Sequence, residues 1–144
     1  MSTHVHPRTD SSVARVALGL AAAAVISIIV NTGVALGALA LNPNGTNIGL
    51  NLVAYAPLTV VGVIAGSIGW ALVRRRAANA RAVLRVLVPV VVVLSFTPDI
   101  LLTVVGVADV INVVGLLVMH VVVATSTVTA VSRVLPLAGY RRTV

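Results

Sequence analysis

The stretch RRRAANARAVLR, residues 74–85, carries five of the ten arginines of this chain and lies between two long apolar blocks. The other five arginines are at positions 8, 15, 133, 141 and 142, toward the two ends. The remaining connections, near residues 42–51 and 105–107, contain no basic residue. Because short basic loops stay in the cytoplasm, this distribution predicts four membrane spans, with both termini and the middle loop cytoplasmic.

The composition leaves little room for anything except membrane helices. The chain has 144 residues, of which 59% are hydrophobic and 9% are charged, and its mean hydropathy is +1.12. Each span needs roughly 20 apolar residues, so four spans leave only short loops and no soluble domain. We therefore predict an all-α, integral membrane four-helix antiparallel bundle, located in the plasma membrane as a multi-pass protein.

The hydrophobic blocks give approximate span boundaries. The polar residues 1–12 are predicted to be a disordered cytoplasmic tail, residues 13–136 the transmembrane domain, and residues 137–144 a second cytoplasmic tail. Tyr55 and Trp70 are expected to anchor the two boundaries of the second span, because such side chains favour membrane interfaces. The four predicted spans are 13–41, 52–73, 82–104 and 108–135.

The third span is rich in β-branched residues, but a lone strand in lipid cannot satisfy its backbone, so a helix is predicted. The sequence SFTPD, residues 95–99, interrupts its apolar run. Either the helix ends near Thr97 and a re-entrant segment follows, or it continues through a kink at Pro98 to about Val104. The sequence leaves both alternatives open.

Composition also excludes several classes of function. The chain has no Cys, which excludes disulfides, thiolate catalysis and Cys-ligated metals. It shows no nucleophile elbow, phosphate loop or metalloprotease motif, so we predict no enzymatic activity, no cofactor and no metal site. The net charge of +7 sits at span ends, which favours anionic lipid headgroups over nucleic acid as the counterpart of Arg74, Arg75, Arg76 and Arg81.

Polar side chains inside the hydrocarbon layer are the best candidates for a site, because burying them unpaired is costly. Asp99 is either a proton or cation site or the outer gate residue of a polar pocket, or it caps a helix that begins at Ile100 or faces water in the outer loop. His120 is either a proton relay or metal ligand, or it makes a plain interhelical hydrogen bond to Asn31 or Ser95. The full predicted polar layer is Asn31, Thr59, Ser95, Asp99, Asn112 and His120.

Glycines recur at spacings that permit close helix contact. Gly33 and Gly37 are four residues apart in the first span, and Gly62, Gly66 and Gly69 follow in the second. Such spacing lets two backbones approach closely, within one chain or between copies. We expect a homo-oligomer, or membership of a larger membrane protein complex, in contact with membrane lipids.

Three short motifs suggest a family. They are YAP at residues 55–57, with Gly62, Gly66 and Trp70 after it; LSFTPD at 94–99; and Met119-His120 before an apolar run. In this order the chain resembles a family of small actinobacterial four-helix membrane proteins that is catalogued as a domain of unknown function. The resemblance implies a four-helix membrane bundle from the first span to Pro136, and it implies no activity.

These observations favour a small, non-enzymatic scaffold or accessory subunit that acts through helix–helix and lipid contacts. The alternative is a small channel or proton-linked transporter that uses the intramembrane polar layer. A wet cavity connecting the polar residues would favour the transporter, and a dry, paired layer would favour the scaffold. Lipid-modifying chemistry is disfavoured, because Asp99 and Asp109 are the only carboxylates predicted on the outer side.

Overall fold

A computed structural model describes residues 10–137, and in this part the chain forms five helices. They are α1 (Asp10–Leu41), α2 (Leu52–Arg76), α3 (Ala80–Ser95), α4 (Thr97–Val104) and α5 (Val110–Val134). With α3 and α4 taken as one segment, four helices are long and apolar enough to cross a membrane. The predicted all-α architecture with four such helices is confirmed.

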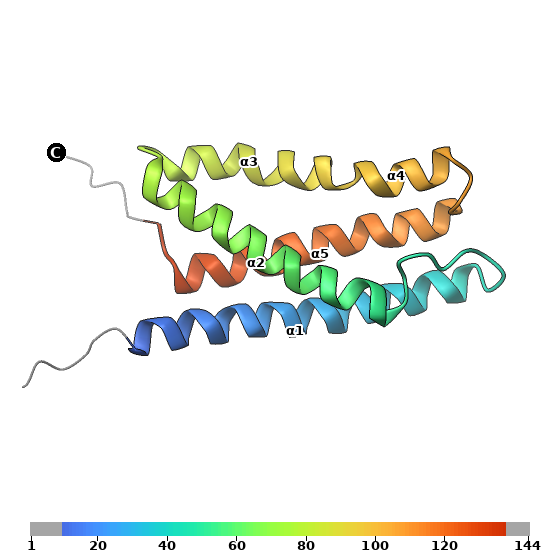
Figure 1. Cartoon of the computed structure of the whole chain (residues 1–144), viewed down its shortest axis with the longest axis horizontal. Helices are drawn as coiled ribbons and strands as arrows, with labels where there is room; N and C mark the ends of the chain where they lie inside the picture. Colours follow the sequence, from blue (N-terminus) through green and yellow to red (C-terminus); the bar gives the residue numbers. More distant parts are fainter. Residues whose placement is uncertain (1–9, 138–144) are drawn as a thin grey trace, which may run out of the picture.

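With α3 and α4 taken as one segment, each helical segment runs antiparallel to the next along the long axis of the bundle (Figure 1). The turn between α2 and α3 lies at the same end as the start of α1 and the end of α5. We call this the basic end, because it carries Arg15, Arg74, Arg75, Arg76, Arg81, Arg85 and Arg133. The opposite end, which we call the loop end, contains the connections 42–51 and 105–109. The placement of the basic end in the cytoplasm stays a prediction.

The helix bounds differ from the predicted spans by a few residues. α1 begins at Asp10, so residues 10–12, predicted as part of a disordered tail, are helical. α2 continues through all three arginines to Arg76, and α5 covers Val110–Val134. The rest of the predicted N-terminal tail, and the predicted C-terminal tail beyond residue 137, lie outside the described residues.

The third apolar segment, residues 80–104, is helical throughout except for one break. Only Phe96 separates α3 from α4, and the two helices lie nearly in line (Figure 1). Pro98 has no N–H to donate to the carbonyl of Leu94, and its ring would clash with that carbonyl in a continuous helix. The helix therefore restarts with Pro98 in its first turn. Of the two alternatives, the structure matches continuation to Val104 and not a re-entrant segment.

Three helices begin at an Asx residue whose side chain accepts a backbone N–H, which satisfies a donor that the first turn leaves free. Asn51 accepts from Ala54 at 2.9 Å, and Asn79 accepts from Ala82 at 3.1 Å. Asp109 caps α5 by accepting from the N–H of Asn112 at 2.9 Å. Asp99 does not cap a helix, because it lies inside α4.

The interior is split into two apolar clusters with polar residues between them. The cluster toward the loop end contains Ala35, Ala38, Leu50, Tyr55, Leu116 and Met119. The cluster toward the basic end contains Trp70, Leu84 and Val131. Ser27 and Asn31 of α1, which are 0% and 1% exposed, lie between the two clusters along the helix. This division places hydrogen-bonding groups deep inside the apolar bundle.

Candidate intramembrane site

A buried pair joins α1 to α2 in the middle of the bundle. The Nδ2 of Asn31 donates a hydrogen bond to the Oγ1 of Thr59 at 3.3 Å, and both residues are buried. The Oδ1 of Asn31 and the hydroxyl of Ser27, one helical turn earlier, are buried without a hydrogen-bond partner. The Asn31–Thr59 bond fixes the register of the two helices.

Tyr55 is part of this interior and not an interface anchor as predicted from the sequence. Its side chain is buried in the cluster toward the loop end. The hydroxyl of Thr32 donates to the carbonyl of Ile28 at 2.8 Å, so the phenol of Tyr55 donates in turn to Thr32 at 2.7 Å. A buried tyrosine needs such a partner for its hydroxyl. This bond is a second polar link between α1 and α2.

The main feature of the layer is a contact between Asp99 on α4 and His120 on α5. The Oδ2 of Asp99 lies 3.3 Å from the Nδ1 of His120. That nitrogen also lies 3.0 Å from the carbonyl of Leu116, where the hydrogen-bond geometry is satisfied, whereas Oδ2 makes no such bond. A single Nδ1–H can donate to only one of them, so the proton has two alternative acceptors. We therefore treat the Asp99–His120 contact as an ion pair by distance, with no directed hydrogen bond.

The break between α3 and α4 shapes the surroundings of this pair. Phe96, which forms the break, packs edge-on against the His120 ring, with centroids 6.1 Å apart and planes at 81°. Thr103, one turn beyond Asp99, has a buried hydroxyl with no partner. Phe96 thus covers one side of the imidazole, while the His120 side chain is 36% exposed. The Asp99 side chain, 12% exposed, is the more deeply buried partner.

A third polar group closes the loop end. Asp109 accepts hydrogen bonds from the N–H and hydroxyl of Thr46 at 2.6 and 2.8 Å. With the N–H of Asn112 as the largest cause and Thr46 next, these bonds lower the pKa of Asp109 from 3.8 to about 2. Asn112, 1% exposed, donates through Nδ2 to the carbonyl of Ile48 at 3.0 Å. Together these bonds fasten the 42–51 loop to the start of α5.

The six residues predicted as one layer thus fall into separate groups. Asn31 pairs with Thr59, Asp99 with His120, and Asn112 with the loop backbone. Ser95 donates only to the carbonyl of Val92 on its own helix, at 2.7 Å. The hydrogen-bond partners predicted for His120, Asn31 and Ser95, are wrong, because its Nδ1 bonds to the carbonyl of Leu116 and lies next to Asp99 instead. Sequence reasoning did not single out Thr103, or the roles of Thr32 and Phe96.

The predicted glycine positions also divide into two kinds. A Cβ added at Gly62 would lie 3.2 Å from Val123 on α5, and one at Gly66 would lie 3.1 Å from Thr127. Those two glycines let α2 and α5 approach closely. An added Cβ at Gly33, Gly37 or Gly69 would meet no atom within 4 Å. These three glycines have no packing role within the single chain.

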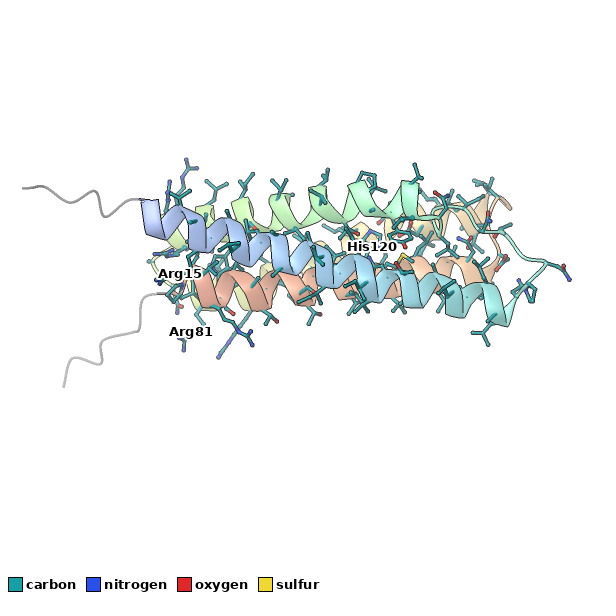
Figure 2. All side chains as sticks on the ribbon, turned by 90° about the horizontal axis from the view of Figure 1, so that it is seen from below. Arg15, Arg81 and His120 are labelled. Carbon is teal, nitrogen blue, oxygen red and sulfur yellow. The ribbon has the colours of Figure 1, made fainter. Side chains whose placement is uncertain are left out.

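Two surface grooves lie toward the basic end, and neither is lined by Asp99 or His120. Arg81, which lines one of them, lies far along the bundle from His120 (Figure 2). One, of about 310 Å³, runs between α1 and α5 and includes Gly19 and Arg133. The other, of about 320 Å³, lies between α2, α3 and the end of α5 and includes Trp70, Arg81 and Arg85. Neither groove is lined by a member of the predicted polar layer.

The sequence motifs, the four long apolar helices and the polar layer can be compared with known proteins. A family model described as a family of unknown function, DUF6069, matches residues 7–137. This chain belongs to the DUF6069 family. The match agrees with the resemblance to a family of unknown function and assigns no activity to DUF6069. We found no match to the chain among the curated proteins or among the solved structures.

Proposed function

We propose that this chain is a small, non-enzymatic subunit of the plasma membrane that acts through helix–helix and lipid contacts and assembles with copies of itself. One observation carries the proposal. Gly33 and Gly37 lie one turn apart on an exposed face of α1, where an added Cβ would meet nothing. In a bilayer this is a flat strip on which a second helix can pack at short distance.

The contrast within the chain supports this reading. Gly62 and Gly66 have the same spacing, and α5 already packs against them. The strip at Gly33 and Gly37 has equivalent geometry and no helix of the same chain upon it. Glycine in a helix costs roughly 1 kcal/mol relative to alanine. Two unpacked glycines at this spacing are therefore best explained by a partner outside the monomer.

The polar layer supports a structural role for the interior. Several of its members bond to another part of the chain or to their own helix: Asn31 to Thr59 on α2, Asn112 to the carbonyl of Ile48 in the 42–51 loop, and Ser95 to the carbonyl of Val92. Neither of the two grooves reaches them. Interhelical bonds of this kind fix helix register and contribute about 0.6–2 kcal/mol each. Such a paired layer favours a scaffold, or an accessory subunit of a larger membrane complex, over a transport path.

Disulfide cross-linking in native membranes tests the α1 contact, because the natural chain has no Cys. Ala40→Cys places a thiol about 20° around the helix from Gly33, whereas Leu39→Cys places it about 120° away. Both positions are exposed. We expect oxidation to give a dimer band with Ala40→Cys and little with Leu39→Cys. Equal cross-linking of the two variants would contradict a specific face.

The Asp99–His120 contact favours a second candidate, proton exchange within the membrane. A carboxylate and an imidazole 3.3 Å apart can share one proton, and ionisable residues at this depth commonly mark relays. The test is proton flux in proteoliposomes with Asp99→Asn and His120→Ala, and with Ser95→Ala as the control. Equal flux in wild type and both site variants would remove this candidate.

A further inference from the structure

The groove between α2, α3 and the end of α5 combines an apolar wall with two unpaired cations. Its apolar wall is formed by Leu84, Val88, Pro89, Val128 and Leu137. Arg81 and Arg85 stand four residues apart, so both lie on one face of α3. Among the side chains that the structure describes, no carboxylate pairs with either guanidinium. The groove is thus lined almost entirely by apolar atoms, and two arginine side chains are among its lining residues.

Trp70 gives the groove a fixed wall. Its indole is 8% exposed, and its Nε1 donates to the carbonyl of Leu135 at 3.0 Å. This bond holds the end of α5 against α2, and Leu137 lines the groove just beyond it. A tryptophan next to basic side chains is typical of the level of lipid headgroups. The wall is therefore in place before any ligand binds.

The charge of the groove defines its ligand. Of the three acidic residues of the chain, Asp99 lies in α4 and Asp109 caps α5 at the loop end, both remote from the basic end. The third, Asp10, begins α1, and no residue of α1 lines the groove. A phosphate can accept hydrogen bonds from both guanidinium groups, and guanidinium suits phosphate in geometry and charge. A volume of about 320 Å³ is at the small end of ligand sites. It suits a segment of one acyl chain and not a whole lipid.

We propose that this groove binds one anionic phospholipid from the leaflet at the basic end. Arg81 and Arg85 hold the phosphate, and an acyl chain lies along Leu84 and Val88 beside Trp70. The proposal goes beyond a general attraction of Arg74–Arg76 to the membrane surface, because it names a built site with two specific cations. It does not depend on the self-assembly of α1, which lies outside this groove.

Trp70 is the only tryptophan of the chain, and its fluorescence reports directly on the groove. The full chain is reconstituted in phosphatidylcholine vesicles that contain brominated phosphatidylglycerol or the same amount of brominated phosphatidylcholine. We expect the brominated anionic lipid to quench Trp70 more strongly. Arg81→Gln with Arg85→Gln should reduce this preference by about fivefold for each arginine removed. Equal quenching by the two lipids in wild type would overturn the proposal.

Two variants distinguish lipid binding in the groove from a general attraction of anionic lipid to the basic end. Arg75→Gln with Arg76→Gln removes the same charge from the end of α2, and neither residue lines the groove. This control should keep most of the preference, and a loss as large as that of the groove variant would reduce the effect to general attraction. Val88→Phe fills the apolar part without changing charge and should weaken quenching. Unchanged quenching in Val88→Phe would place the acyl chain outside the groove.

Discussion

The Nδ1 of His120 on α5 lies 3.3 Å from the Oδ2 of Asp99 on α4, inside a segment long and apolar enough to cross a membrane. His120 is about ten residues into α5 and Asp99 about five before the end of α4, a difference in depth of roughly 7 Å. Helical side chains lean toward the N-terminus of their own helix. Since α4 and α5 run antiparallel, the two side chains lean toward each other and close the difference.

This pair should couple the stabilities of α4 and α5. Removing His120 leaves the carboxyl of Asp99, whose side chain is 12% exposed, without its partner, whereas His120 keeps its contact with the carbonyl of Leu116 when Asp99 is removed. We expect a double-mutant cycle of Asp99→Asn and His120→Ala to give a coupling free energy of about 1 kcal/mol, measured by unfolding in detergent micelles. The same cycle with Ser95→Ala in place of Asp99→Asn should give a value near zero. Additive effects of Asp99→Asn and His120→Ala would contradict the pairing.

The bond between Asn31 and Thr59 should contribute to the packing of α1 on α2. Thr59→Val keeps the shape of the side chain and removes the acceptor of the Asn31 amide. We expect a loss of about 1 kcal/mol in the free energy of unfolding. Thr125→Val is the matched control, because the Thr125 hydroxyl is exposed and bonds only to the carbonyl of Val121. An equal loss in the two variants would count against the interhelical bond.

Asp109 should make the loop end sensitive to acid. Its folded pKa, about 2, is below its usual value of 3.8, so its stabilising effect is complete above that usual value and is lost as pH falls toward 2. Asp109→Asn should lower stability at neutral pH and flatten the dependence between pH about 4 and 2. Thermal unfolding of both proteins across this range measures the difference. Parallel pH profiles would contradict the role given to the Thr46 and Asn112 bonds.

The two kinds of glycine should respond differently to a larger side chain. Gly66→Val forces a Cβ to within 3.1 Å of Thr127, and we expect it to destabilise the chain by about 1–3 kcal/mol. Gly69→Val, on the same helix, meets no atom within 4 Å and should leave the stability nearly unchanged. Thermal unfolding in micelles compares the two. A larger loss at Gly69 would show that α2 packs differently.

Much of the fold follows from apolar length and arginine placement, because each span needs a long hydrophobic run and each basic cluster ends one. Pro98 made a break near Phe96 predictable. The sequence could not show whether the helix continues beyond the break or turns back, since a kink and a re-entrant turn use the same residues. The Asp99–His120 contact was not predicted because the depth of each residue was estimated from its position along the helix alone. That estimate ignores the direction in which each side chain leans. Likewise, nothing in the sequence distinguishes Gly33 and Gly37 from the packed pair Gly62 and Gly66.

Self-association through α1 is tested most directly by the mass of the intact protein extracted in native membrane nanodiscs. We expect a defined multimer of identical chains in wild type, and a shift to monomers when Gly33→Leu and Gly37→Leu are combined. Ala21→Leu, at an exposed position about 120° around α1 from Gly33, should keep the multimer. A wild-type protein that is a single chain in the nanodisc would contradict the account.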